Sequence, residues 1–220
     1  MSPEKGECPK NFLHHWNSHE GSMGMCQDDK NVYDLAVERR TIRKFLPRSV
    51  PGELLTRLVE AARLAPSAAN VQPLEFVVVD EPGMLAEVFP CLKWAAYIAP
   101  AGDPKAGEEP AAYVVTLVNT KVREKMYEYD VGAAMENMIL AALGEGVGSC
   151  WLLSIDRDRL RAILGVPEEY RIDSVLALGY PAEEPAAEIM GDSCRYWKDA
   201  EGRMHVPKRP LASVLHLNKF

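Results

Sequence analysis

The 220-residue sequence predicts an α+β fold, in which a sheet is flanked by helices. Two mostly apolar runs of strand length, 74–79 and 112–118, indicate buried strands. Around these runs, apolar residues recur at helical spacing. Helices and strands interleave without regular βαβ units, which favours α+β over a doubly wound α/β fold.

The N-terminal residues 1–26 show no periodicity, so we expect a flexible extension followed by one domain over 27–220. The extension is alternatively sequence upstream of the functional start, which then lies near Met25. Three histidines occur here, His14, His15 and His19. These histidines could alternatively form a metal site, but no pattern of carboxylate or thiolate residues nearby supports one.

In the first third of the domain, residues 31–39 are typical of a short helix, and a loop closed by Pro47 follows. A second helix begins near Pro51, since proline is favoured in the first turn. Its apolar stripe is Leu54, Leu55, Leu58, Val59 and Ala62. Pro66 ends it, because the residue before a proline avoids helical backbone angles.

The rest of the chain alternates between helices, strands and loops. We expect a turn at 80–83, an irregular loop at 99–110, a helix at 130–143, a strand at 149–153, a helix between Asp156 and Gly165, and a strand at 174–178. The helix at 130–143 has small residues on several faces, which indicates a central position. A basic tail then leads to a short apolar segment around Val214.

The glycine-rich run Gly144–Gly148 superficially resembles a dinucleotide-binding loop. Its glycines leave a helix and enter a strand, whereas that fingerprint needs the order strand, turn, helix. We interpret the run as the end of a helix and a turn.

The formal charge of −7 and the isoelectric point near 5.3 argue against a general nucleic-acid or anionic-membrane binder. No apolar run is long enough for a membrane span, and no secretory signal is evident. Five scattered cysteines without a C-x-x-C pair fit a reducing cytoplasm, and we interpret them as structural or idle thiols. We therefore expect a cytoplasmic protein without a metal site.

A cationic segment stands out against this acidic background. Five of the 25 Lys and Arg residues lie within ten positions, namely Arg39, Arg40, Arg43, Lys44 and Arg48. Guanidinium groups next to a hydroxyl, here Thr41, suit a phosphate because they donate parallel hydrogen bonds. The alternative is an ordinary solvated face.

A second segment, 65–73, joins a helix to a buried strand. Its two prolines stiffen the backbone, and Ser67, Asn70 and Gln72 provide polar groups that a ligand can contact. The alternative is a self-capped loop, in which these side chains bond their own main chain.

Together these segments resemble a known family. Glu38 to Phe45 and Ala65 to Pro73 are similar to the two N-terminal signatures of the FMN-dependent nitroreductase family. Residues 130–151 resemble that family's central helix and following strand, and 178–181 and 208–211 are also similar. The resemblance covers roughly residues 30–215, in order.

The resemblance implies an interlocked homodimer with a mostly antiparallel sheet and FMN at the dimer interface. It places Arg39, Arg40, Thr41, Arg43, Lys208 and Arg209 near the flavin phosphate. It places Pro66, Ser67, Ala68, Asn70 and Gln72 near the flavin of the partner subunit, and the backbone of Leu152 and Leu153 against the flavin ring.

The implied activity is hydride transfer from NADH or NADPH through FMN to a small electrophile such as a nitroaromatic or quinone. No side chain is identified as a proton donor; Trp94, Tyr127 and Tyr129 are candidates for lining the acceptor pocket, although each equally fits packing. The sequence has Leu74 where the family often has an aromatic residue, and the region 80–110 is short where longer members carry a helical lid.

Two alternatives remain open at this point. One is different flavin chemistry on the same fold, such as enoate reduction, reductive dehalogenation or flavin breakdown. The other is a non-catalytic flavin carrier or a module that binds a phosphorylated partner.

Overall fold

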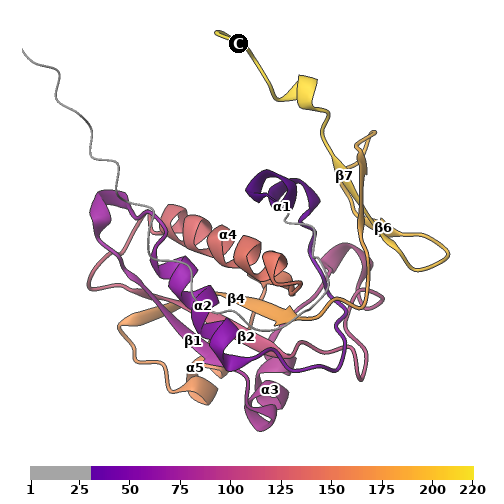
Figure 1. Cartoon of the computed structure of the whole chain (residues 1–220). Coiled ribbons are helices and arrows are strands. Elements are labelled where there is room, and N and C mark those ends of the chain that lie inside the picture. The colour runs from indigo at the N-terminus through magenta and orange to yellow at the C-terminus, as the bar shows by residue number, and fades with distance from the viewer. Residues whose placement is uncertain (1–30) are drawn as a thin grey trace, which may run out of the picture.

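A four-stranded sheet forms the centre of the computed structural model, which describes residues 31–220 (Figure 1). Its strands are β1 (Leu74–Val79), β2 (Ala112–Asn119), β3 (Gly148–Leu152) and β4 (Tyr170–Gly179). They lie in the order β1-β2-β4-β3, and every neighbouring pair is antiparallel. The α+β prediction is therefore confirmed. The predictions for residues 1–26 lie outside the described residues.

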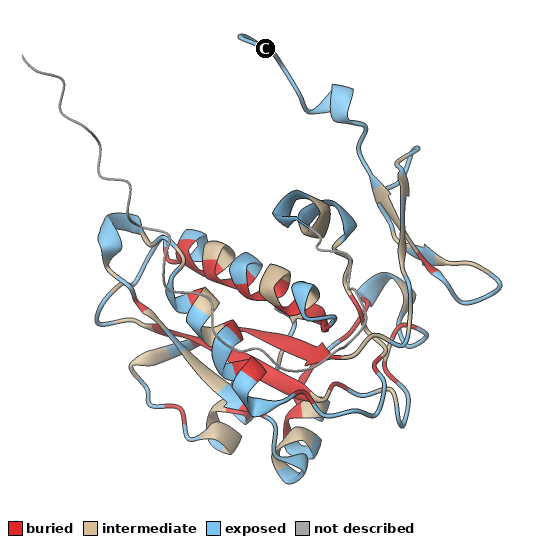
Figure 2. Ribbon diagram, in the orientation of Figure 1, coloured by how far each residue is buried: buried red, intermediate tan, exposed pale blue. Residues whose placement is uncertain are grey.

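Helices cover both faces of this sheet. The helices α2 (Gly52–Arg63) and α4 (Glu128–Gly144) pack on one face, and α3 (Pro82–Val88) and α5 (Arg157–Leu164) pack on the other (Figure 1). The first seven residues of β2 are buried, as its mostly apolar run predicts (Figure 2). Two layers of core thus hold the sheet from above and below.

The short helix α1 (Val32–Glu38) lies at the C-terminal end of α4, where Leu35 packs against Gly144. Asn31 caps α1, because its side-chain oxygen accepts hydrogen bonds from the N–H groups of Tyr33 (2.9 Å) and Asp34 (3.1 Å). Asp156 caps α5 in the same way, and Gly165 ends it in a left-handed conformation.

The turn expected at 80–83 is wrong, because it forms the start of α3. The Glu81 carboxylate accepts the Met84 N–H (2.8 Å), and Pro82 occupies the first helical position. A capping signal so close to the end of β1 fits a turn equally well. The glycine-rich run 144–148 does lead from helix α4 into strand β3, as expected.

A second, smaller sheet near the C-terminus was not predicted. It consists of β5 (Ala186–Ile189), β6 (Trp197–Lys198) and β7 (Met204–Lys208), with β5 parallel and β6 antiparallel to β7. These strands are too short to show an alternating pattern. Beyond β7 the tail projects away from the body and is exposed (Figures 1 and 2).

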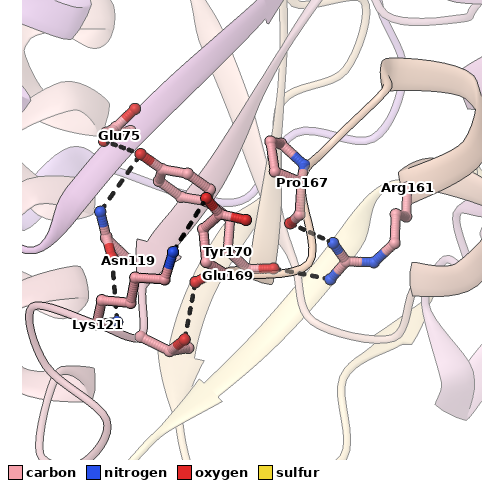
Figure 3. Close-up of polar contacts among 8 residues, drawn as sticks. Glu75, Asn119, Lys121, Arg161, Pro167, Glu169 and Tyr170 are labelled. Carbon is pink, nitrogen blue, oxygen red and sulfur yellow. Dashed lines mark hydrogen bonds and ion pairs between the residues drawn. The ribbon is translucent and has the colours of Figure 1, made fainter.

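A polar network fastens the start of β4 to the other strands (Figure 3). The Tyr170 hydroxyl donates to Glu75 of β1 (2.6 Å), and Arg161 of α5 donates to the carbonyls of Pro167 (2.6 Å) and Tyr170 (2.7 Å). We interpret this network as structural. Across the described part of the chain, no helix combines the length and apolar character that a membrane crossing needs.

Candidate functional site

The cationic segment lies along the edge of the central sheet. Thr41 pairs with Ser149 of β3, and the Ile42 N–H donates to the Ser149 carbonyl (2.9 Å). Gly148 permits this approach, because a Cβ atom there would lie 2.7 Å from the Ile42 side chain. The segment is thus held in place by backbone contacts rather than by its charged side chains.

The same close approach continues a few residues further along the segment. Phe45 is buried and pairs with Pro181, and a Cβ at Gly179 would lie 2.8 Å from its ring. The structure therefore brings together three stretches that the sequence analysis identified separately, namely 38–45, the C-terminal part of 130–151, and 178–181.

Two of the arginines make contacts within the chain. The Arg39 guanidinium lies 3.6 Å from the Glu136 carboxylate of α4. Arg40 donates to the carbonyls of Val37 (2.8 Å) and Arg39 (2.5 Å), at the C-terminal end of α1. Both arginines border a pocket of about 210 Å³. The side chain of Arg40 is thus engaged with the main chain, and Arg39 is partly neutralised.

Arg43 is different. Its guanidinium carbon lies 5.1 Å from the centre of the Tyr196 ring. Its Nε atom is buried and has no hydrogen-bond partner among the described residues. A buried donor without an acceptor is costly, by about 1–3 kcal/mol. Arg43 therefore has a donor that is free to serve an acceptor from outside the described residues.

A cleft of about 560 Å³ opens beside Arg43, within the range of ~300–1,000 Å³ that small-molecule sites occupy. It is lined by Arg43, Leu92, Lys93, Trp94, Ala95, Ala96, Ala99, Asp103, Cys150, Trp151, Leu152, Leu153 and Ser154. The indole Nε1 of Trp94 is a second buried donor without a partner among the described residues. Leu153 is 57% exposed just after β3. The cleft thus combines apolar walls with unused donors.

Cys150 is a poor nucleophile in this cleft. Burial raises the pKa of its thiol to about 12, and the nearby Arg43 charge only partly opposes that shift. The thiol is therefore protonated near neutral pH. Residues 31–220 contain no group of three His, Cys, Asp or Glu side chains arranged to hold a metal ion.

The loop from Pro66 to Gln72 has an unusual backbone. Ala69, Asn70 and Gln72 all have positive φ angles, 55°, 54° and 55°, which cost energy for residues other than glycine. Asp130, 3% exposed at the start of α4, accepts the Ala68 N–H (2.9 Å). From outside the loop, Arg123 donates to the Ala68 carbonyl (2.8 Å). These contacts hold the loop in its strained shape.

Part of this loop is self-capped. The Ser67 hydroxyl accepts the Gln72 N–H (3.0 Å), and the Gln72 side chain donates to the Asn70 carbonyl (3.2 Å). Ala68 and Asn70 are exposed. Pro66, Ser67 and Gln72 border a pocket of about 160 Å³. The loop thus offers a rigid backbone and the exposed side chains of Ala68 and Asn70, while the side chains of Ser67 and Gln72 bond within the loop.

The two predicted signatures line different pockets of one chain. The loop contacts Asp130 in the first turn of α4, whereas the pocket beside Arg39 includes Ile139 and Leu143 of the same helix. Because a helix rises 1.5 Å per residue, Ile139 and Leu143 lie about 13 Å and 20 Å from Asp130 along the axis of α4.

Lys208 and Arg209 lie at the end of β7 and just beyond it. Lys208 pairs with Ile189 of β5, and Arg209 donates to the Ser213 carbonyl of the tail (2.5 Å). Of the three aromatic candidates for an acceptor pocket, Trp94 lines the cleft. Tyr127 is buried and accepts a hydrogen bond from Arg171 (2.8 Å), and Tyr129 is 73% exposed.

Tyr196 is a neighbour of Arg43 that the sequence did not reveal. It packs against Arg43, which lies 153 positions earlier, and its hydroxyl accepts the Tyr97 N–H (3.3 Å). The Tyr97 and Tyr196 rings lie 4.9 Å apart. No local pattern marks such a long-range contact.

Comparison with known proteins identifies the family of this chain. The nitroreductase family profile matches residues 36–180. A protein of Archaeoglobus fulgidus, provisionally named NADH dehydrogenase/NAD(P)H nitroreductase, is 35% identical over 153 residues, which cover 66% of this chain and 83% of that protein.

Solved structures share the fold. An FMN-dependent nitroreductase of Clostridium difficile superposes with a TM-score of 0.61 at 23% identity, covering 84% of this chain and 98% of that one. A provisionally named nitroreductase of Desulfovibrio desulfuricans, solved with FMN, gives 0.63 at 23% identity, covering 87% and 98%. The family profile spans more than half of the chain, which is therefore a member of the nitroreductase family of oxidoreductases.

Proposed function

We propose that this protein is an FMN-dependent oxidoreductase that takes a hydride from NADH or NADPH and reduces a small electrophile such as a nitroaromatic or a quinone. The observation that carries the proposal is the cleft beside Arg43, with its unused donors and its exposed Leu153. The similar Desulfovibrio desulfuricans protein was solved with FMN, which supports the choice of cofactor.

The residues of the cleft fit a flavin. The unpartnered Nε of Arg43 and Nε1 of Trp94 are donors, and FMN carries acceptor atoms both on the edges of its ring and on its phosphate. Leu152 and Leu153 give an apolar surface next to those donors. Bound FMN would supply the hydride chemistry, as redox cofactors do generally.

The cationic residues are the natural partners of the flavin phosphate. We assign the phosphate to Arg39, Arg40, Thr41, Arg43, Lys208 and Arg209. The Thr41–Ser149 pairing holds the first four against β3 in a fixed position. This preorganisation favours binding, because little conformational freedom is lost when the ligand arrives.

We further propose that the active molecule is a homodimer. Large apolar side chains are exposed in α1 and in the C-terminal tail: Val32, Tyr33, Val37, Leu211, Val214, Leu215, Leu217 and Phe220. The tail projects from the body (Figure 1), and a second copy is a partner that covers such surfaces. In this dimer, Pro66, Ser67, Ala68, Asn70 and Gln72 of one subunit complete the flavin site of the other.

An absorption spectrum of the purified protein tests the cofactor. We expect flavin bands in the visible blue that persist through gel filtration, and free FMN after heat release. The loaded protein should then oxidise NADH or NADPH and pass electrons to a nitroaromatic or quinone with ping-pong kinetics. A colourless protein that also refuses added FMN would reject the flavin proposal, and tight FMN binding without turnover would indicate a carrier.

A further inference from the structure

His205 lies at the centre of the small C-terminal sheet, outside the part of the chain that the family profile matches. Its Nδ1 atom is 3.2 Å from the Glu188 carboxylate of β5. Its Nε2 atom is 3.0 Å from the Asp199 carboxylate, which follows β6. Trp197 of β6 stacks on the imidazole ring at 4.2 Å and donates its indole N–H to Glu188 (2.9 Å). One side chain thus contacts groups from both neighbouring strands.

These two contacts favour a protonated ring. A carboxylate accepts hydrogen bonds, and a neutral imidazole has only one N–H to donate. Only the imidazolium donates to both acids at once. When the ring loses a proton, one nitrogen becomes an acceptor that faces a carboxylate, and one of the two bridges is lost.

The bridge lies close to the proposed phosphate cations. His205 and Lys208 are on the same strand, and Ile189, next to Glu188, pairs with Lys208. The Met190 N–H donates to the Lys208 carbonyl (2.8 Å). The parallel pairing of β5 with β7 therefore positions the end of β7, from which Lys208 and Arg209 extend.

We propose that His205 is a positioning residue: as an imidazolium it ties β5 and β6 to β7, and it thereby holds Lys208 and Arg209 in place for the flavin phosphate. The inference rests on the proposed function. It makes FMN affinity depend on the protonation of a residue that does not touch the flavin.

The charged surroundings favour the protonated form. The hydrogen bond to Asp199, followed by the one to Glu188, raises the pKa of His205 above its usual value of 6.5, although burial opposes the shift. Arg203 is a nearby cation: its main-chain N–H donates to the Asp199 carboxylate (2.7 Å), and the Nε of its guanidinium donates to the Glu184 carbonyl (3.0 Å). Lys198 donates to Ala101 (3.1 Å).

The sign of the pH dependence follows. Because the pKa is raised in the folded protein, the stabilisation by the bridge is complete below pH 6.5 and is lost as the pH rises through the raised value. FMN affinity should therefore fall on the alkaline side.

The test is flavin binding to the full-length protein at about pH 6 and about pH 9, measured by flavin fluorescence with FMN and with riboflavin, which lacks the phosphate. For the wild type we expect FMN binding to weaken by about three- to tenfold at high pH, while riboflavin binding changes little. A loss of this size corresponds to part of the contribution of one charge-assisted hydrogen bond. H205Q should bind FMN weakly at both pH values. H14Q, which removes a histidine outside the small sheet and outside the proposed dimer surface, is the matched control.

The phosphate of FMN also changes ionisation near pH 6, and H205Q reports that contribution separately. Equal pH profiles for the wild type and H205Q, or an equal loss for riboflavin, would overturn the inference while leaving the proposed function intact. A wild type that binds no FMN at either pH would overturn both. A proton NMR titration of the His205 ring, with the signal assigned in the wild-type protein itself, gives an independent reading that does not depend on the variant's fold. We expect a midpoint above 6.5, and a midpoint at or below 6.5 contradicts the bridge.

Discussion

Arg43 differs from its neighbours in how its charge is used. Arg39 approaches Glu136, and Arg40 caps the end of α1, but the Nε atom of Arg43 is buried without an acceptor among the described residues. Proteins rarely leave a buried donor unpaired unless a ligand or water completes it. Among the cations of the segment, Arg43 is thus the one whose side chain most clearly indicates a bound acceptor.

The double variant Arg39→Ala with Arg43→Ala tests this assignment. Removing a charged hydrogen-bond partner typically costs about 1.5–3 kcal/mol, so FMN binding should weaken at least about tenfold. The fold should persist, because the backbone contacts of Thr41 and Ile42 hold the segment. Flavin fluorescence measures the affinity, and circular dichroism checks the fold.

The matched control removes two exposed arginines elsewhere, Arg57 of α2 and Arg159 of α5, and changes the net charge equally. It should keep FMN affinity at the wild-type level at moderate salt, since charges more than about 10 Å apart are screened. If the Arg39/Arg43 double variant binds FMN with wild-type affinity, these two arginines do not form the phosphate site.

At this scale the sequence identifies the cationic segment but not what each arginine does. Chemical type and spacing indicate a phosphate site, and the structure places Arg39, Arg43 and Thr41 on one stretch of backbone. The commitment of Arg40 to main-chain carbonyls depends on where α1 ends. The packing of Tyr196 on Arg43 depends on a sheet that no local pattern shows.

At the scale of elements, the position of the site depends on two glycines. Gly148 and Gly179 leave room for Ile42 and Phe45, so the cationic segment lies directly against β3 and β4. The family signatures 146–151 and 178–181 thus have a packing reason that is separate from ligand binding. The small C-terminal sheet had no comparable signal, because two- to five-residue strands carry little periodicity.

Gly148→Ala should disturb both stability and the site. The new Cβ would lie 2.7 Å from Ile42, and overpacking of this kind typically costs about 1–3 kcal/mol. Urea unfolding should show that loss, and FMN affinity should fall because residues 41–43 shift away from β3. Gly191→Ala is the control, since a Cβ at that position would meet no described atom within 4 Å. Equal stability of the two variants would show that the close approach is not needed.

The strained loop gives a prediction of the opposite sign. Ala69 has a φ of 55°, which costs about 1–2 kcal/mol for a residue with a Cβ. Ala69→Gly removes that strain, although glycine loses about 0.4–1 kcal/mol through the greater freedom of the unfolded chain. We expect a net stabilisation of about 0.5–1 kcal/mol in urea unfolding. A clear loss of stability would mean that the methyl group of Ala69 makes a contact that outweighs its strain.

For the whole molecule, the main feature is that the residues predicted to bind FMN are spread over separate parts of one chain. One chain carries the cationic segment and the 66–72 loop in different pockets, and its tail exposes a row of apolar side chains. A homodimer accounts for both facts, because each subunit then supplies one half of each site. The sequence implied this arrangement only through family resemblance, since oligomerisation leaves no periodic signal in a single chain.

Mixing two defective variants tests the shared site. Arg39→Ala/Arg43→Ala damages the phosphate side, and Ala68→Glu places a charged side chain on the exposed loop that we assign to the partner's flavin. Each variant alone should bind FMN poorly.

In a dimer with two shared sites, a mixed dimer has one site with both defects and one with neither. Random exchange gives about half mixed dimers, so about a quarter of the wild-type flavin content should return. Unfolding and refolding the variants together, followed by gel filtration and an absorption spectrum, measures that content. If no flavin returns although mixed dimers form, both signatures act within one subunit, and the shared site is wrong.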